Sequence, residues 1–289
     1  MEGIGTQVYC QRMTMVEQSK LDRLKDLLCN MQRVIVAFSA GVDSTFLLKV
    51  AIDTLGQDNV VACTAVSPSL AQAELQSVRD LAGRMGATLR LLQTREMDNP
   101  RYAENSAKRC YFCKSELYEK VGQVAKELGI AFILNGANQD DTGDYRPGMD
   151  AAKEFGVRAP LLEAGMTKAD IREFSKQLGL PTWDKPALAC LASRVPYGTP
   201  VTIRSLSQIE QGEAFLRKRG FPICRVRHHS TLARIEVPAD RLAELLTDPL
   251  RADLIAHFKK IGYTYVTVDV QGFRSGSGNE TLPAAVRAK

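Results

Sequence analysis

The chain of 289 residues has only three histidines, no long apolar run and no dense block of basic residues. No stretch approaches the roughly 18 apolar residues of a membrane span, and the first 20 residues lack the apolar core of a secretory signal. We therefore expect a cytoplasmic protein without membrane contact. The formal net charge of +5 is mild, so electrostatics permits small phosphorylated partners without requiring nucleic acid.

Two common phosphate-binding signatures are absent as well. The sequence has neither the Gly-x-x-x-x-Gly-Lys-Ser/Thr pattern nor the Gly-x-Gly-x-x-Gly pattern. In their place, the run Ser-Ala-Gly-Val-Asp-Ser at residues 39–44 stands between an apolar stretch and an amphipathic one. Small residues let backbone N–H groups approach an anion, and a helix that follows adds its unpaired N–H groups and positive dipole end. The pattern predicts a strand, a phosphate loop and a helix.

Strand-like and helix-like patterns alternate from residue 19 to residue 180, which predicts an α/β fold: a parallel sheet with helices on both faces. The expected strands cover residues 33–39, 60–66, 88–93 and 131–135, and the expected helices residues 19–31, 45–55, 70–85, 111–128 and 168–180. Ligands of such sheets bind at the carboxyl ends of the strands. Thr64 and Ser67 after the second strand, and residues 136–138 after the fourth, are therefore expected beside the phosphate loop, although ordinary loop chemistry explains each of them equally well.

A stretch rich in proline and glycine over residues 180–200 separates this pattern from a different one. Beyond it we expect helices at 203–219, 239–246 and 250–261 and strands at 224–229, 233–237 and 263–270, which is a small α+β unit. The predicted organisation is an N-terminal extension over residues 1–18, a phosphate-binding domain over 19–186 and a C-terminal α+β domain over 187–289.

Three of the seven cysteines stand out. Cys29 and Cys63 lie in apolar patterns and are expected to be buried, whereas Cys110 and Cys113 form a Cys-x-x-Cys pair and Cys190 lies alone. A structural zinc site would need a fourth cysteine or histidine, and all three histidines lie far along the second unit. A cubane cluster held by three cysteines leaves one iron open. A redox disulfide or a fortuitous packing pair explains the Cys-x-x-Cys spacing too.

Basic residues in the second half of the chain are candidates for binding an anion. Arg225 and Arg227 alternate along an expected strand, so both side chains point to one face and could bind a phosphate or carboxylate. A solvated strand face explains the pair equally well. Arg194 follows Cys190 by four residues. Glu210 and Glu213 lie one helical turn apart, and we expect them on a solvated helix face without a role in acid–base chemistry.

Taken together, four motifs resemble the LarE family, a group within the PP-loop ATP pyrophosphatases. They are residues 39–44, residues 109–114, residues 136–141 with 144–148, and residues 183–198, and the resemblance covers about residues 19–275. The loop alone would also fit tRNA thiolation enzymes, NAD synthetase and GMP synthetase. The stretch through Cys190 is much more specific to one family. Ala40 replaces a glycine of the family pattern, which is tolerable if φ is negative there.

The resemblance implies an ATP-dependent sulfurtransferase that adenylates a carboxylate of pyridinium-3,5-biscarboxylate mononucleotide and converts it to a thiocarboxylate in nickel-pincer nucleotide biosynthesis. It implies ATP and Mg²⁺ as cofactors and Cys190 and Asp43 as catalytic residues. It further implies Arg194, Arg225 and Arg227 as substrate-binding residues and self-association as a homo-oligomer. The implied nucleotide-binding residues are Ser39, Gly41, Val42, Asp43, Ser44, Thr64 and Ser67.

The resemblance also implies a route for sulfur. Family members with three cysteines are thought to bind a 4Fe-4S cluster that carries a transferable sulfide from a sulfide source, and Cys110, Cys113 and Cys190 match them. In members with a single cysteine, the equivalent of Cys190 gives up its own sulfur. Two other readings stay open: a tRNA-thiolating enzyme with the same loop, and a zinc- or redox-regulated nucleotide-binding module without catalysis.

Overall fold

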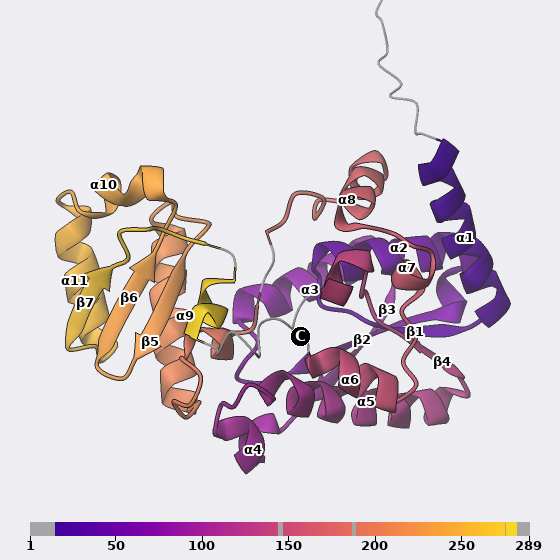
Figure 1. Ribbon diagram of the computed structural model, residues 1–289, viewed down its shortest axis with the longest axis horizontal. Coiled ribbons are helices and arrows are strands. Elements are labelled where there is room, and N and C mark those ends of the chain that lie inside the picture. The colour runs from indigo at the N-terminus through magenta and orange to yellow at the C-terminus, as the bar shows by residue number, and fades with distance from the viewer. Residues whose placement is uncertain (1–14, 144–146, 187–188, 275, 282–289) are drawn as a thin grey trace, which may run out of the picture.

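The computed structural model describes residues 15–143, 147–186, 189–274 and 276–281, which fold into two sheet-based units (Figure 1). The larger unit has a four-stranded parallel sheet in the order β3-β2-β1-β4, and the smaller has a three-stranded sheet in the order β5-β6-β7. The predicted fold class is confirmed. The strands are β1 (Val34–Ala37), β2 (Val60–Val66), β3 (Thr88–Gln93), β4 (Phe132–Leu134), β5 (Arg225–His229), β6 (Leu232–Glu236) and β7 (Tyr265–Val268).

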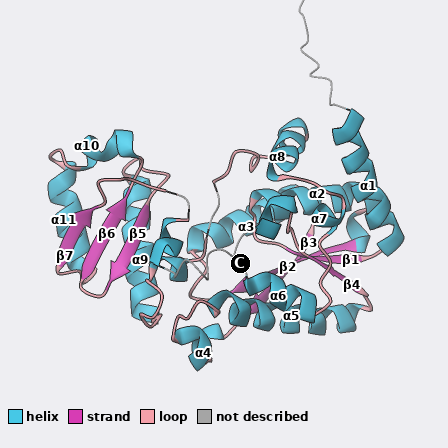
Figure 2. Ribbon diagram, viewed as in Figure 1, coloured by secondary structure: helices cyan, strands magenta, loops and turns pink. Residues whose placement is uncertain are grey.

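Helices cover both faces of the parallel sheet (Figure 2). Along β1, Val34 and Val36 pack on one side with α2, whereas Ile35 packs on the other with α5, because side chains alternate between the faces of a strand. The helices on the α2 side are α1 (Met15–Met31), α2 (Val42–Leu55), α3 (Gln72–Arg84), α7 (Pro160–Glu163) and α8 (Lys168–Gln177), and those on the other are α5 (Arg109–Leu128) and α6 (Pro147–Glu154).

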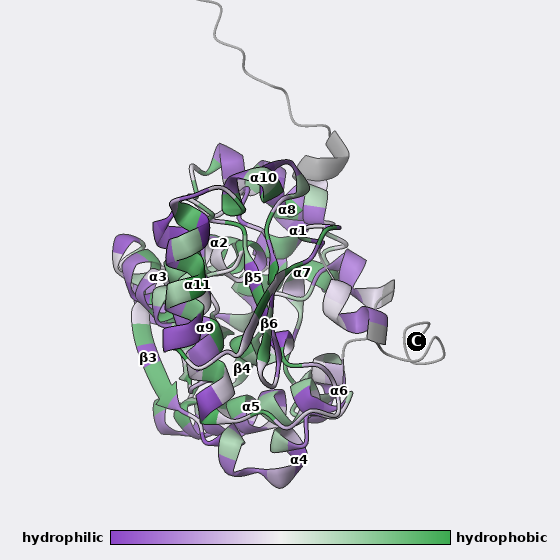
Figure 3. Cartoon of the chain, turned by 90° about the vertical axis from the view of Figure 1, so that its left-hand side faces the viewer, coloured by the Kyte–Doolittle hydropathy of each residue, from purple (hydrophilic) through white to green (hydrophobic). Residues whose placement is uncertain are grey.

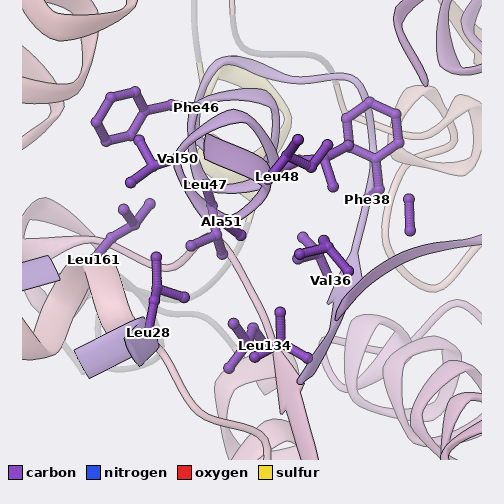
Figure 4. Packing of buried hydrophobic residues seen from close by; sticks show 14 of the residues in the cluster. Leu28, Val36, Phe38, Phe46, Leu47, Leu48, Val50, Ala51, Leu134 and Leu161 are labelled. Carbon is purple, nitrogen blue, oxygen red and sulfur yellow. The ribbon is translucent and has the colours of Figure 1, made fainter. Parts of the chain in front are cut away.

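Helix α2 is the most deeply embedded of these elements. Phe46, Leu47 and Leu48 are fully buried, and Figure 4 shows Leu47 and Leu48 near Val36 and Leu134 of the sheet. This packing holds the start of α2 rigidly against the carboxyl end of β1. The loop between β1 and α2 therefore has a fixed position.

The strand order identifies where a ligand would bind. From β1 the chain moves outward through β2 to β3, and it then returns to place β4 on the other side of β1. The direction of winding reverses between β1 and β4, and in open α/β sheets the crevice at such a point is where ligands bind. The loops after β1 and β4 meet there.

The smaller unit packs α9 (Ile203–Lys218) and α11 (Leu250–Lys260) on its sheet. Strands β5 and β6 are antiparallel and β6 and β7 are parallel. Leu216, Ile235 and Phe258 are completely buried between the layers. Figure 3 shows hydrophobic and hydrophilic residues interspersed along the helices of this unit. The short helix α10 (Leu242–Leu245) precedes α11.

The connection between the units packs on the larger one. Leu191, Ala192, Val195 and neighbouring apolar residues form one cluster with Tyr102, which lies in the short helix α4 (Pro100–Ala103). The chain after the expected boundary at residue 187 therefore begins on the surface of the first unit. Residues 187–188, most of the expected N-terminal extension and residues 144–146 of one motif lie outside the described residues. None of the described helices is long and apolar enough to cross a membrane.

Candidate functional site

The predicted phosphate loop lies between β1 and α2. The Ser44 hydroxyl accepts a hydrogen bond from the Ser39 backbone N–H (3.2 Å), and the two serine hydroxyls are 3.1 Å apart. Helix α2 begins at Val42, and its N-cap residue Gly41 provides no side-chain hydrogen bond. The first N–H groups of α2 thus point into the loop without a side-chain cap, and this arrangement suits an anion.

The backbone of Ala40 differs from expectation. Its φ is +56°, in the left-handed region that glycine adopts readily, so the negative φ that would make alanine comfortable is not found. Gly41 has φ −82°, and a Cβ added there would meet only the Ser39 hydroxyl, at 3.4 Å. Position 40, where the sequence has alanine, is therefore the one in residues 39–44 that favours glycine.

Asp43 is held by residues from distant parts of the chain. The Lys168 ammonium, near the start of α8, forms an ion pair with it, and the Asn138 amide donates to its carboxylate at 3.3 Å. A Cβ at Gly136 would lie 3.0 Å from the Ser44 nitrogen, so glycine allows the loop after β4 to approach. The loops after β1 and β4 meet as predicted. Sequence reasoning missed Lys168, because nothing in its local pattern marks it.

The two residues predicted after β2 have internal partners. The Thr64 hydroxyl is buried and donates to the Phe38 carbonyl at 2.6 Å, so it ties β2 to the end of β1. The Ser67 hydroxyl accepts from the Ser69 N–H at 3.2 Å. The Thr64 contact favours a bracing role for this residue over direct contact with a nucleotide.

The fold brings the three candidate cysteines together. Cys110 and Cys113 lie in the first turns of α5, and Cys190 precedes the 3₁₀ turn Leu191–Arg194. A charge on Cys190 raises the pKa of both other thiols, so the three are electrostatic neighbours. Burial, followed by Glu96 and Cys190, raises the pKa of Cys113 to about 12.

All described cysteines are free thiols. Cys63 is buried as expected, but Cys29 is exposed, contrary to expectation.

The groups around these thiols bear on whether they could hold a metal. Burial and the neighbouring Cys190 raise the pKa of Cys110, and the positive charges of Arg109 and Lys114 offset part of this rise. Glu96 is 2% exposed, and its Oε2 has no hydrogen-bond partner among the described residues. No three His, Cys, Asp or Glu side chains in the described ranges converge on a single ion. The cysteine ligands of a cubane cluster bind different irons, so they need not converge on one ion.

Arg194 holds the backbone that carries Cys190. Its Nη1 donates to the carbonyls of Ala189 (2.5 Å) and Cys190 (2.9 Å). Its Nε and Nη2 form a bidentate pair with Glu213 at 2.8 and 3.1 Å. Arg194 is 3% exposed and Glu213 is fully buried, so the expectation of a solvated face for Glu213 is wrong. These contacts favour a positioning role for Arg194 over the substrate-binding role that was predicted.

Arg225 and Arg227 are both buried, so a solvated strand face does not explain them. Arg227 forms a bidentate pair with Glu236 at 2.9 and 3.0 Å and donates to the Ser277 hydroxyl at 2.7 Å. Arg225 stacks on the Phe273 ring with 5.0 Å between guanidinium carbon and centroid. Burial and the neighbouring Arg194 lower the pKa of Arg225 to about 10.

The remaining glutamate of α9 links the two units. The Glu210 carboxylate accepts a hydrogen bond from the Gln72 backbone N–H at 2.6 Å, at the start of α3. The structure therefore uses Glu210 as a contact between the larger unit and the smaller one.

The fold and site define an α/β protein with an uncapped helix start at the switch point of its sheet and three thiols where its two units join. No family model matches the chain. Over 262 residues it is 39% identical to the pyridinium-3,5-bisthiocarboxylic acid mononucleotide synthase of Lactiplantibacillus plantarum, a match that covers 91% of this chain and 93% of that protein. The chain belongs to this family, the LarE family, and is an enzyme; the resemblance is confirmed at this level.

Two further relatives span the same two units. A protein of Synechocystis described as uncharacterized is 45% identical over 265 residues, covering 92% of this chain and 98% of the relative. An uncharacterized protein of Methanocaldococcus jannaschii is 27% identical over 265 residues, covering 90% of this chain and all of the relative. The two matches therefore cover nearly the full length of both relatives.

Proposed function

We propose that the protein is an ATP-dependent sulfurtransferase that converts a carboxylate of pyridinium-3,5-biscarboxylate mononucleotide to a thiocarboxylate for a nickel-pincer nucleotide. The observation that carries this proposal is the 39% identity, across both units, to a synthase named for the bisthiocarboxylic acid mononucleotide. The uncapped start of α2 and the neighbouring thiols support the two halves of the reaction, activation by ATP and transfer of sulfur.

Activation is required because the oxide of a carboxylate leaves poorly. A substrate carboxylate oxygen attacks the α-phosphorus of ATP, the bond to the β-phosphate oxygen breaks, and pyrophosphate departs. The N–H groups at the start of α2 would hold the phosphates, and Asp43 would bind Mg²⁺ or orient the loop. Lys168 forms an ion pair with the Asp43 carboxylate and so holds it in place.

Sulfur then replaces the activated oxygen. A sulfur nucleophile attacks the acyl carbon, and AMP leaves with the former carboxylate oxygen. Cys110, Cys113 and Cys190 would hold a 4Fe-4S cluster, with Arg109 and Lys114 stabilising the thiolates. When bound, such a cluster supplies an iron that can carry sulfide. Arg194 fixes the Cys190 backbone for either route, including one in which the Cys190 sulfur itself is consumed.

Pyrophosphate release tests the activation step. Purified protein with Mg-ATP should form pyrophosphate only when the pyridinium mononucleotide is present, and tRNA should not replace it. Pyrophosphate formation that depends on tRNA would favour a tRNA-thiolating enzyme, and nucleotide binding without any pyrophosphate would favour a module without catalysis.

Iron content and the mass of Cys190 test the sulfur route. After anaerobic reconstitution we expect about four irons per chain and broad visible absorption, both lost when Cys110, Cys113 or Cys190 is changed to alanine. Several turnovers should occur with added sulfide, and the mass at Cys190 should not change. Dehydroalanine at Cys190 after one turnover, with active Cys110→Ala and Cys113→Ala variants, would establish the sacrificial route instead.

A further inference from the structure

Lys185 reaches the phosphate loop from the segment that leads to Cys190. Its ammonium donates to the Ala40 carbonyl at 3.1 Å and forms an ion pair with Glu74 of α3 at 3.0 Å. Arg172 of α8 fixes the backbone of the same segment by donating to the carbonyls of Trp183 (2.7 Å) and Lys185 (3.0 Å). The lysine is thus held at both ends, with its charge at the edge of residues 39–44.

The surroundings leave this charge accessible to a ligand. The Lys185 side chain is 20% exposed and the Glu74 side chain 25%. An ammonium has three N–H donors, and among the described residues Lys185 has two acceptors, the Ala40 carbonyl and the Glu74 carboxylate. An anion held by the loop N–H groups would lie beside it. Lys168, the other lysine at the loop, is instead paired with a loop residue, Asp43.

We propose that Lys185 binds a phosphate of the nucleotide at residues 39–44, keeping its bond to the Ala40 carbonyl and exchanging Glu74 for a phosphate oxygen. This inference rests on the proposed use of ATP. Lysine binds phosphate as a compact point charge, and a charge-assisted contact of this kind is strong. The contact also ties the segment that carries Cys190 to the occupied loop.

Binding of α,β-methylene-ATP with Mg²⁺, measured by calorimetry, tests the contact without turnover. Lys185→Met should weaken binding roughly 10- to 100-fold, the usual range for a lost charge-assisted hydrogen bond, and Lys185→Arg should restore part of the loss. The matched control is Lys176→Met. The Lys176 ammonium of α8 contacts the segment that carries Lys185, since it lies 5.1 Å from the Trp183 ring centroid. It should bind the analogue like the unchanged protein.

The Glu74→Gln variant distinguishes a phosphate contact of Lys185 from a purely structural link between α3 and the loop. If Lys185 exchanges Glu74 for phosphate, removing the carboxylate should tighten analogue binding severalfold, and this gain should vanish in the Lys185→Met background. A brace between α3 and the loop predicts weaker binding after Glu74→Gln. That result, or a gain that persists without Lys185, overturns the proposal.

The outcomes also separate this inference from the proposed function. If the unchanged protein does not bind the analogue, the ATP-dependent function itself fails. If it binds and Lys185→Met binds equally well, only the role of Lys185 fails. Thermal unfolding of each variant identifies a loss caused by misfolding, and Lys185→Arg and Glu74→Gln then decide the matter in place of Lys185→Met.

Discussion

The ion pairs at the phosphate loop and those of the smaller unit differ in their exposure to solvent. Asp43 and Lys168 meet at the crevice with side chains that are 23% and 35% exposed. Arg194 and Glu213 meet with side chains that are 2% and 0% exposed, and Arg227 and Glu236 with 9% and 0%. An exposed pair can rearrange around a ligand at little cost, whereas separating a buried pair leaves a desolvated charge. The ion pair at the loop can therefore exchange partners when a ligand binds, whereas the buried arginine pairs hold their segments in place.

Breaking a buried pair should have the largest effect. Glu213→Gln leaves the Arg194 charge without its carboxylate, and we expect a loss of about 3–5 kcal/mol in the free energy of unfolding. Denaturant titration measures it. Glu210→Gln, one turn away on α9, is the control and should cost less than about 1.5 kcal/mol. Equal losses in the two variants would contradict the distinction between buried and exposed charges.

The same pair makes stability depend on pH. Burial raises the pKa of Glu213, but Arg194 and Arg225 outweigh it, and the net pKa is lowered. The resulting stabilisation is present above the ordinary glutamate pKa and is lost as the pH falls through the folded value. Glu213→Gln should lack this part of the acid sensitivity.

Changing the loop carboxylate should affect activity and leave stability nearly unchanged. Asp43→Asn should reduce substrate-dependent pyrophosphate formation by about 10²- to 10³-fold, the usual cost of removing one preorganised electrostatic group. A phosphate-release assay coupled to pyrophosphatase measures it. Asp53→Asn is the control on the same helix; the Asp53 carboxylate forms an ion pair with Lys49, and this variant should keep the activity. Wild-type rates in Asp43→Asn would remove this residue from the mechanism.

Replacing Arg225 and replacing Arg227 should affect different properties, substrate binding in the first case and stability in the second. Arg225→Met should raise the KM for the mononucleotide by about tenfold or more, since a charge-assisted contact contributes about 1.5–3 kcal/mol. Arg227→Met should mainly lower stability, because it leaves Glu236 buried without its bidentate partner. Steady-state kinetics and denaturant titration on both variants make the comparison. An unchanged KM for Arg225→Met would assign Arg225 to structure as well.

The smallest effect concerns the backbone of the loop. Ala40→Gly should stabilise the protein by about 1 kcal/mol, because the left-handed conformation costs alanine about 1–2 kcal/mol and glycine very little, offset in part by the entropy of glycine. Ala40→Val, with a branched side chain at the same positive φ, should destabilise it. Denaturant titration measures both. Destabilisation by glycine would show that the packing of the buried Ala40 methyl outweighs the strain.

Much of the larger unit was predictable because its signals are local. The continuous apolar run at residues 34–38 and the small residues at 39–44 predicted a buried strand, a loop and a helix, and these elements were found. The prediction failed where a partner lies far away in the sequence. Glu213 was predicted to lie on a solvated helix face, because the sequence pattern of α9 does not reveal that Arg194 packs against it.

By itself the sequence determined the α/β fold and the position of the loop at residues 39–44, since apolar runs and loop composition are properties of short segments. Only the tertiary structure decided the left-handed backbone of Ala40, the lysines that meet the loop and the burial of the arginine pairs. These features depend on packing between segments that are separated in the sequence. Lys168 and Asp43 are 125 residues apart, and Arg194 and Glu213 are 19 residues apart.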